Sequence, residues 1–380
     1  MKKKESIIKV LKYIRILGIR RTVVKILGRL RLKNKFIFKL LFPFKRKNPR
    51  IAIIGCGQFS FSTIAYFLSA KTQYSIKYCY DISENNSNSF ANFYNCKSVK
   101  NVAEILNDKD VGYVYIASDH FSHTDYAIKC LNAQKKVHLE KPISVSEDQF
   151  LRLLKTLKET NGRLVAGYNR PFSQAIEIVD DHIRETKLPL TTTMTIFGHK
   201  IPEDHWYRQQ HQGTRICGNV GHWLDLSMHL MAIRGNIPNK VDVAILWANV
   251  DESPDDDISI SISTDFNDII NITLTSRSEP FEGINEEILI QSGDLIAKID
   301  DFRNIQYWNS TDYKYIKFSP KDVGHSKSTR QITNDFSRDW NEVILSTILM
   351  LKITDMVKNK TPSCSILLKE EFEKIQKSTC

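Results

Sequence analysis

The stretch RIAIIGCGQFS at residues 50–60 decides the fold of this chain. Residues 51–54 form a short apolar run, which is typical of a strand buried on both faces of a parallel sheet. Gly55 permits a tight turn, Gly57 leaves room for a ligand to approach the backbone, and Ser60 is small enough for close helix–strand packing. The helix that follows presents free N–H groups to an anion. The motif predicts a pyrophosphate site, with Gln58 and Phe59 as further candidate contacts in the same loop.

A carboxylate follows the next predicted strand at the place where a dinucleotide presents its ribose. Strand YSIKYCY (74–80) ends at Asp81, 24 residues after Gly57. A carboxylate there accepts hydrogen bonds from both ribose hydroxyls of NAD and repels the extra phosphate of NADP. Since no Lys or Arg follows within the next few residues, NAD is favoured over NADP. The alternative is a solvated carboxylate at a strand end.

Helical and strand patterns continue to alternate up to residue 169. Helices are predicted near 101–107, 122–133 and 145–160, and strands at 111–117, 135–140 and 163–169. Repeated units of this kind imply a doubly wound parallel sheet.

Beyond residue 169 the apolar residues recur with period two. Runs at 240–250, 257–266, 268–276 and 286–292 predict an open, mostly antiparallel sheet with one buried face. Residues 344–357 predict an apolar closing helix, and the polar stretch 322–332 predicts a mobile loop. The fold class is therefore α/β followed by α+β, with a basic arm (1–49), a dinucleotide-binding domain (50–168) and a substrate-binding and oligomerisation domain (169–380).

Composition excludes several protein classes. The chain has 380 residues, of which 42% are hydrophobic and 26% charged, so it is too apolar to be disordered and large enough for two domains. Its seven Cys form no CxxC pair, which favours reduced thiols and a cytoplasmic location.

The basic charge is concentrated at the N-terminus. Residues 1–50 hold 18 Lys and Arg against one acid, whereas the remainder carries a net charge of −6. Basic and apolar residues alternate there at helical spacing, with Val23, Val24, Ile26, Leu27 and Leu30 on one face, and aromatic residues follow in FIFKLLFPF (36–44) before Lys45-Arg46-Lys47. Such helices are typical of binding to an anionic membrane surface on the inner side. An arm packed on the body or on a partner is the alternative, and no motif for reading nucleic acid accompanies the charge.

Three further motifs resemble the Gfo/Idh/MocA family, the group of glucose–fructose oxidoreductase and inositol dehydrogenase. Residues 118–123 (SDHFSH) are similar to the family's T-P-N-x-x-H after the fourth strand, matching at Ser118 and His123. Glu140-Lys141-Pro142 is an intact E-K-P, and residues 167–170 (GYNR) are similar to its G-[FY]-N-x-R-F segment. The resemblance covers residues 50 to about 235 well and implies a Rossmann domain with an open antiparallel sheet behind it.

The resemblance also assigns roles to these residues. Lys141 would contact both cofactor and substrate and take part in proton transfer, and Glu140 would hold the nicotinamide ribose. Ser118, His120, His123 and Asn169 are further candidate cofactor contacts. A Lys at the carboxyl end of a parallel strand faces the ligand crevice and can stabilise a developing alkoxide, which agrees with this assignment. The alternative is a surface lysine.

A second cluster lies at Gly218-Asn-Val-Gly-His-Trp-Leu-Asp225. His222 and Asp225 fit the family's H-x-x-D, but the Asp usual four residues before the His is Gly218 here. Asn219, beside this position, can bond a sugar but cannot shuttle a proton. Proton transfer is therefore assigned to Lys141 and His222, with His222 as general base because its ordinary pKa is near neutral. The alternative is a core histidine bonded to Asp225.

His222, Asp225 and His229 share one helical face, so a metal site is a further alternative. Because hydride transfer to NAD needs no metal and the family does not normally use one, we expect none.

Residues 205–215 are rich in stacking and hydrogen-bonding groups. Trp206 is predicted to stack on a sugar ring and Arg208 and Arg215 to bind phosphate. Tyr168, Asn219, His222 and Asp225 complete the candidate substrate contacts. The alternative is an ordinary polar loop.

These observations predict an NAD-dependent oxidoreductase that acts on a secondary hydroxyl or ketone of a sugar. A nucleotide-sugar of surface-polysaccharide biosynthesis is favoured, because such precursors are assembled at the cytoplasmic leaflet, where a basic arm would hold the enzyme. A free-sugar or inositol-type polyol dehydrogenase is the second candidate. A catalytically weak NAD-binding scaffold or sensor at the membrane is the third. We expect a homo-oligomer, dimer or tetramer, and no nucleic-acid partner.

Overall fold

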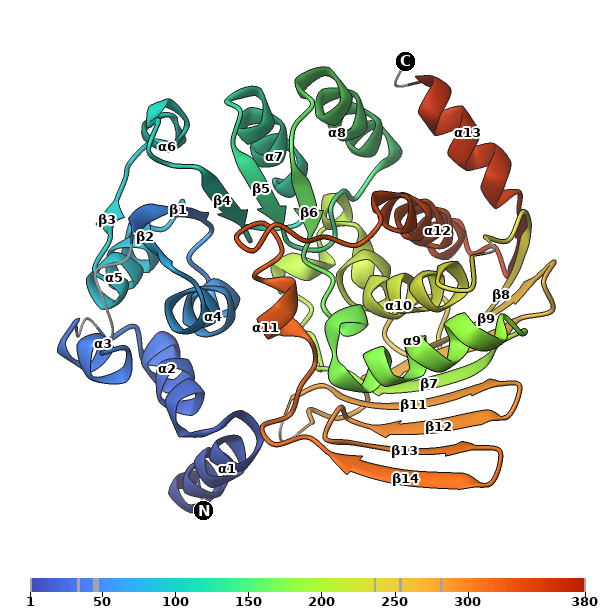
Figure 1. The fold of residues 1–380 in the computed structure, drawn as a ribbon. Helices are drawn as coiled ribbons and strands as arrows, with labels where there is room; N and C mark the ends of the chain where they lie inside the picture. The colour runs from blue at the N-terminus through green and yellow to red at the C-terminus, as the bar shows by residue number, and fades with distance from the viewer. Residues whose placement is uncertain are drawn as a thin grey trace.

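The computed structural model describes residues 2–32, 35–43, 48–235, 237–252, 255–280 and 283–378. Two sheets dominate it, with helices packed around the first and on one face of the second (Figure 1). The predicted fold class is confirmed.

The first sheet holds six parallel strands in the order β3-β2-β1-β4-β5-β6. The strands are β1 (Asn48–Ile54), β2 (Tyr74–Tyr80), β3 (Lys97–Ser98), β4 (Tyr113–Ile116), β5 (Lys136–Leu139) and β6 (Leu164–Ala166). The connecting helices are α4 (Ala65–Lys71), α5 (Glu84–Tyr94), α6 (Val102–Asn107), α7 (His123–Asn132) and α8 (Glu147–Thr160). The apolar run 51–54 is completely buried, as expected for a central parallel strand. This order puts the ends of β1 and β4 side by side, at the point where the strand order reverses.

The second sheet holds nine strands in the order β14-β13-β12-β11-β7-β10-β9-β8-β15. All neighbours are antiparallel except β10 and β7. Its strands are β7 (Thr191–Phe197), β8 (Val241–Trp247), β9 (Ile258–Thr264), β10 (Ile269–Thr275), β11 (Asn285–Ser292), β12 (Leu295–Asp300), β13 (Asn304–Asn309), β14 (Asp312–Lys317) and β15 (Ser363–Ile366). Alternating exposure along β8 to β12 confirms the single buried face that period two predicts.

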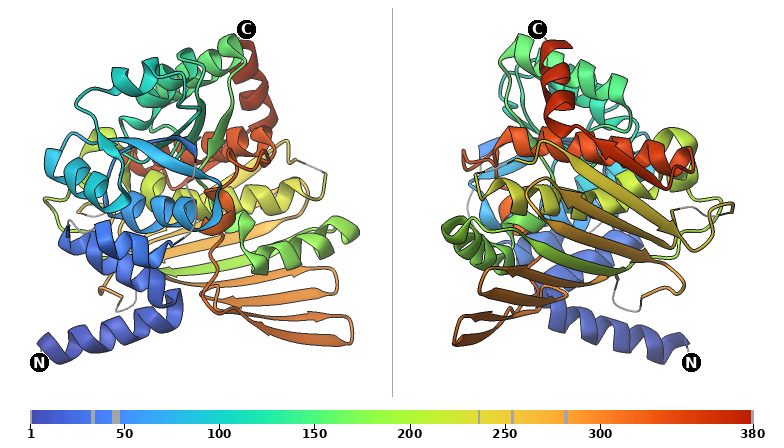
Figure 2. Two further views of the ribbon diagram at one scale, coloured as in Figure 1. Left: turned by 60° about the vertical axis from the view of Figure 1, so that its left-hand side comes forward. Right: turned by 90° about the vertical axis from the view of Figure 1, so that its right-hand side faces the viewer.

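Helices cover the buried face of this sheet. They are α9 (Gln174–Thr186), α10 (Gly221–Ala232) and α12 (Trp340–Lys358), with α13 (Leu368–Ser378) closing the chain (Figures 1 and 2). Side chains of α10 and α12 join both sheets in one apolar core. The core fixes the start of α10 against the carboxyl ends of the parallel strands.

The prediction of a mobile loop at 322–332 is wrong. This segment forms the short helix α11 (His325–Ser328) and packs along the crevice end of the first sheet. Tyr115 Oη donates to the Thr329 carbonyl at 2.8 Å, and Gln331 Nε2 donates to the Ala166 carbonyl at 3.1 Å. Its polar side chains therefore serve as partners for strand-end groups rather than facing solvent.

The N-terminal arm forms three helices, α1 (Lys2–Leu17), α2 (Ile19–Leu30) and α3 (Lys35–Leu41). The apolar face of α2 packs on the dinucleotide-binding domain, where Val24 and Leu27 join a core with Phe61. Phe38 of α3 lies edge-on to Phe93, with ring centroids 5.8 Å apart. Packing on the body, the alternative considered for the arm, is thus observed for α2 and α3.

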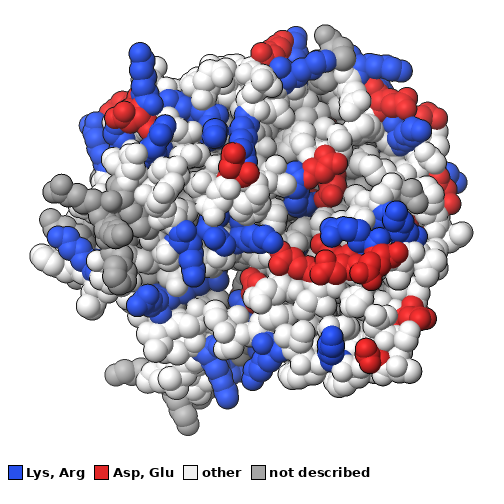
Figure 3. All heavy atoms as spheres, in the orientation of Figure 1, with Lys and Arg blue, Asp and Glu red and all other residues white. Residues whose placement is uncertain are grey.

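The first helix of the arm is different, because it extends away from the body with the N-terminus at its far end (Figure 2). Large apolar side chains are exposed along the arm at Ile7, Ile8, Leu11, Ile19, Leu30, Leu32, Phe36 and Leu40. Lys and Arg side chains gather over α1 and α2, at the lower left of Figure 3. The predicted basic-aromatic segment at 44–47 lies outside the described residues. No helix in the described part of the chain is both long and apolar enough to span a bilayer.

Candidate active site

The glycine loop has the geometry of a phosphate cradle. Gly55 has a φ of 90°, and a Cβ there would lie 2.4 Å from the Ala117 carbonyl oxygen, so only glycine fits. A Cβ on Gly57 would meet nothing within 4 Å, so a ligand can approach this backbone closely. Asp81 Oδ2 accepts the Cys56 N–H at 2.7 Å, which places the carboxylate beside the loop. These residues fit a dinucleotide, with Gly57 under the pyrophosphate and Asp81 at a ribose.

The arm touches this loop directly. Arg31, just after α2, donates to the Cys56 carbonyl at 2.8 Å, and Gln58 Nε2 donates to the Lys25 carbonyl at 3.0 Å. The side chain of Gln58, a predicted cofactor contact, is therefore held by the arm. Burial lowers the pKa of Lys25 to about 8, helped by the nearby cations Arg29 and Arg21. The glycine loop is consequently held in part by the backbone of α2 and by the residue that follows this helix.

Lys141 bonds to the second domain. It lies two residues after the end of β5, and its Nζ donates to the Gly218 carbonyl at 2.6 Å. Gly218 lies in the turn Ile216–Val220 that leads into α10, four residues before His222. The two predicted catalytic side chains are near enough for the charge of Lys141 to lower the pKa of His222.

Burial sets the protonation of both groups. It lowers the pKa of Lys141 to about 8, with the Arg170 charge acting in the same direction and Glu140 opposing it. Burial and the cations Arg170 and Lys141 hold the pKa of His222 well below its usual value. His222 Nδ1 is buried without a hydrogen-bond partner among the described residues. Lys141 is thus the group that changes charge near neutral pH, whereas His222 stays a neutral imidazole.

Two neighbours fix the end of β5. His123 Nδ1 lies 2.8 Å from the Pro142 carbonyl oxygen, and His138 Nε2 lies 3.1 Å from Glu140 Oε1. A Cβ on Gly167 would lie 2.6 Å from the Glu140 carboxylate, so the glycine of the GYNR segment makes room for it. Glu140 and His123 act on the Lys141 loop, and their predicted contacts with a cofactor stay predictions.

The loop after β4 is tied to the second domain through a residue that the sequence analysis passed over. Gln212 Nε2 donates to Asp119 Oδ2 at 3.0 Å, and its carbonyl oxygen lies 3.3 Å from His120 Nδ1. Ser122 Oγ donates to Ser118 Oγ at 2.7 Å. Asp119 and His120, which replace the family's Pro and Asn, therefore make an interdomain contact of their own.

Asp225 does not face the crevice. It is completely buried, and its Oδ2 accepts from Arg338 Nη1 at 2.7 Å. His229 lies 2.9 Å from Asp180 Oδ2 and 2.8 Å from Glu342 Oε2. The alternative of a His222–Asp225 bond and the role of Asp225 in substrate binding thus lack structural support. Among the described residues, no group of three or more His, Cys, Asp or Glu side chains is arranged to hold a metal ion.

The two arginines predicted to bind phosphate are already neutralised. Arg208 Nη2 and Arg215 Nη1 each donate to the Asp256 carboxylate at 2.7 Å. Asn219 Oδ1 is held at 3.4 Å by Arg215 Nε. Trp206 is 37% exposed and lies edge-on to His120, with ring centroids 4.9 Å apart. Trp206 is thus placed to contact a ligand, whereas phosphate binding by these arginines has no support in the geometry.

The side chains of Tyr168 and Asn169 contact other groups of the protein. Tyr168 is buried, with its Oη 3.8 Å from Met350 Sδ of α12, and the Asn169 side-chain amide donates to the Val323 carbonyl. Tyr168 therefore packs against α12, and Asn169 holds the segment before α11. Their predicted ligand contacts stay untested.

Other charged groups near the crevice escaped the sequence analysis. Arg170 makes a two-pronged bond to Glu286 of β11, at 2.7 and 3.0 Å, and Trp223 Nε1 donates to the same carboxylate at 2.7 Å. His325 of α11 packs on Phe59 of the glycine loop, with ring centroids 5.6 Å apart. The spacing of these residues along the chain gives no signal, because they come from a turn, two helices, a strand and a loop that only the tertiary fold brings together.

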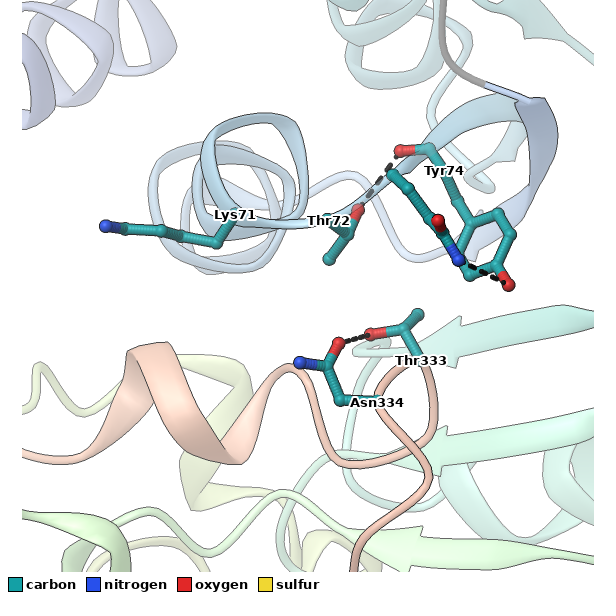
Figure 4. A pocket seen from close by; sticks show the side chains of 6 residues that line it. Lys71, Thr72, Tyr74, Thr333 and Asn334 are labelled. Atoms are coloured by element: carbon teal, nitrogen blue, oxygen red, sulfur yellow. Dashed lines mark hydrogen bonds between the residues drawn. The ribbon is translucent and has the colours of Figure 1, made fainter.

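A hollow of about 400 Å³ lies elsewhere, beside the start of β2 (Figure 4). It is lined by Lys71, Thr72, Gln73, Tyr74, Thr333 and Asn334. Since β2 begins at Tyr74, this hollow is at the amino edge of the parallel sheet. It is thus distinct from the crevice at the carboxyl edge, where ligands of such sheets bind.

Comparison with known proteins supports the fold and the family. Residues 49–168 match an oxidoreductase family with an NAD-binding Rossmann fold, GFO_IDH_MocA. The chain is 26% identical over 186 residues to glucose-6-phosphate 3-dehydrogenase of Bacillus subtilis (strain 168), covering 48% of this chain and 51% of that protein. It is 30% identical over 89 residues to inositol 2-dehydrogenase of Salmonella typhimurium (strain LT2), covering 22% and 26%. The chain thus matches about half the length of the first relative and a quarter of the second.

Levoglucosan dehydrogenase, solved in complex with NADH and L-sorbose, has the same overall fold. The superposition has a TM-score of 0.70 at 14% identity and covers 85% of this chain and 100% of that one. At this identity the likeness shows the fold, including the second sheet.

Proposed function

Since this chain belongs to the Gfo/Idh/MocA family of oxidoreductases through residues 49–168, we propose that it is an NAD-dependent dehydrogenase or reductase acting on a CH–OH group of a sugar or polyol. One observation carries the proposal. Lys141 Nζ lies 2.6 Å from the Gly218 carbonyl oxygen, one helical turn before His222, at the carboxyl edge of a sheet whose glycine loop fits a dinucleotide. The Asp81 carboxylate favours NAD over NADP.

The chain's residues manage the proton in this reaction. Bound nicotinamide supplies the hydride acceptor for the carbinol hydrogen. Neutral Lys141 takes the hydroxyl proton and becomes an ammonium, so the substrate leaves as a ketone. The Gly218 carbonyl keeps the amine aimed into the crevice through its 2.6 Å bond. His222, whose pKa is held well below its usual value, is a weaker base than Lys141, so we assign it the role of hydrogen-bonding and orienting the same substrate; its role as general base stays the alternative.

We expect alcohol oxidation to speed up as the pH rises through about 8. The pKa of Lys141 is lowered to about 8 by burial, and only the neutral amine accepts a proton. Ketone reduction should show the opposite trend, because it needs the ammonium as donor. Profiles of kcat/KM against pH in both directions check this, and a flat oxidation profile through about pH 8 would contradict it.

For the substrate, an inositol-type polyol or simple sugar now competes with a nucleotide-sugar of surface-polysaccharide biosynthesis. The paired states of Arg208 and Arg215 weaken the phosphate argument. The basic arm still favours a reaction close to a membrane. Incubating the protein and NAD with nucleotide sugars and, separately, with free polyols, while following NADH absorbance, distinguishes these classes.

A catalytically weak NAD-binding scaffold remains the candidate of another class. Gly218 and Asp119 support it, as does Pro171, which stands where the family's G-[FY]-N-x-R-F segment has its Arg, since each departs from the family pattern. Calorimetric binding of NAD without turnover of any sugar, polyol or nucleotide sugar would favour the scaffold.

We also propose that α1 binds the inner surface of a membrane from the cytoplasm. Its exposed Ile7, Ile8 and Leu11 lie among basic residues, whereas the apolar face of α2 is already occupied. We expect the full chain to bind vesicles containing phosphatidylglycerol, less so at high salt, and Leu11→Glu to weaken this several-fold. Leu367→Glu, at an exposed position just before α13 and away from the arm, is the matched control. Equal binding by both variants would count against the membrane role.

The outer face of the second sheet is proposed as the surface for self-association. It is lined by hydroxyl and amide side chains, such as the Ser261–Asn271 pair at 2.7 Å, with exposed Leu289 and Phe197 nearby. Light scattering tests for a dimer or tetramer.

A further inference from the structure

Tyr207 occupies the space beside Gly218 that a side chain would fill. An ideal Cβ on Gly218 would lie 2.0 Å from Tyr207 Oη and 2.2 Å from each of two ring carbons. Real contacts of that kind never fall below about 3 Å. The phenol of residue 207 and any side chain at residue 218 therefore exclude each other. Position 218 requires glycine because the Tyr207 ring approaches its Cα closely, although the backbone there is helical.

The phenol lies close to the reactive end of the crevice. Gly218 bears the carbonyl that receives Lys141 Nζ at 2.6 Å, and its Cα side faces Tyr207. Covalent geometry within residue 218 then bounds the distance between Tyr207 Oη and Lys141 Nζ at about 9 Å. A vicinal diol that makes hydrogen bonds of about 2.8 Å to both groups spans up to about 8 Å, which is compatible with this upper bound.

Two aromatic side chains pack against the ring of Tyr207. Its centroid lies 4.6 Å from that of His120 and 4.9 Å from that of Trp206, both edge-on. His120 belongs to the dinucleotide-binding domain, so the ring sits at the domain junction. Burial raises the pKa of Tyr207, which keeps the phenol protonated as a neutral hydrogen-bond donor.

We propose that Tyr207 Oη binds the hydroxyl on the carbon next to the reacting one, so that Tyr207 and Lys141 together select a vicinal diol. This rests on the proposed function, in which Lys141 takes the proton from the reacting hydroxyl. A neutral phenol contributes a hydrogen bond without the charge that a carboxylate would bring to the same place. The substrate class is thereby narrowed to sugars and polyols with adjacent hydroxyls.

Tyr207→Phe tests the proposal, because it removes one oxygen and keeps the ring against His120 and Trp206. The probes are myo-inositol, D-glucose and the monodeoxy-D-glucoses. We expect the variant to lose about tenfold in kcat/KM on the vicinal diols. Wild type should lose a similar factor when the neighbouring hydroxyl is absent, and the variant should lose nothing more. Tyr315→Phe, at an exposed tyrosine of β14, is the matched control.

A second variant and a binding measurement make the outcome decisive. The variant Gly218→Ala should show the same loss of kcat/KM, because the added Cβ displaces the phenol of Tyr207. The double variant with Tyr207→Phe should lose little more than either single variant. Sugar binding to the NADH complex, followed by nicotinamide fluorescence, needs no turnover. Equal binding and equal turnover in wild type and Tyr207→Phe would overturn the inference and leave the proposed function intact. An inert wild type that still binds sugar would overturn the proposed function, and weaker binding in the variant would then leave Tyr207 only as a contact for a bound sugar hydroxyl.

Discussion

Replacing Lys141 with alanine should reduce turnover by at least about a thousandfold while NAD still binds. The amine is the group in the crevice whose pKa, about 8, suits proton transfer near neutral pH. Its loss also removes the 2.6 Å bond that ties the crevice end of β5 to the Gly218 carbonyl. Nothing in the glycine loop depends on it, so calorimetry should give an NAD affinity within a factor of about three.

The variant Lys141→Arg keeps the positive charge of the side chain but removes its ability to transfer a proton. The guanidinium can still donate to the Gly218 carbonyl but does not release its proton near neutral pH. We expect it to be as inactive as Lys141→Ala. Turnover near the wild-type rate in either variant would remove Lys141 from the mechanism.

Val24→Asp should destabilise the dinucleotide-binding domain by about 3–5 kcal/mol and weaken NAD binding. Val24 is completely buried in the core that contains Phe61, so its replacement buries an unpaired charge. When α2 separates, the glycine loop loses the bonds from Arg31 to the Cys56 carbonyl and from Gln58 to the Lys25 carbonyl. Thermal unfolding and NAD titration measure both effects.

Leu30→Asp is the matched control on the same helix, because Leu30 is 61% exposed. We expect its unfolding temperature and NAD affinity to match wild type. If Val24→Asp behaved like this control, the arm would not be part of the folded cofactor domain.

Most of the fold was predictable because its signals are local. The buried run 51–54, the strand 74–80 and the period-two strands each reflect burial of one or two faces, which sequence pattern records directly. The polar segment 322–332 was not predictable, since its hydrogen bonds go to strand ends far away in sequence, such as Tyr115 and Ala166.

The residues of the candidate site likewise fall into those that the sequence predicts and those that it does not. The glycine loop, Asp81 and Lys141 follow strands directly, so topology alone places them at one edge of the sheet. The pairing of Arg208 and Arg215 with Asp256 joins residues 48 and 41 positions apart in the chain, and spacing cannot reveal it. The lipid interpretation of the arm treated amphipathicity as evidence for a bilayer, but an apolar helix face is buried equally well by a protein core.

The arm also bonds to the segment that follows the second sheet, through the Lys321 N–H on the Ile16 carbonyl at 2.8 Å. With α2 packed on the cofactor domain, this bond sets the direction in which α1 leaves the body. If α1 lies on a bilayer, its direction then sets the angle between the ligand site and the lipid plane. Substrate delivery would then depend on the direction from which a molecule arrives as well as on its concentration.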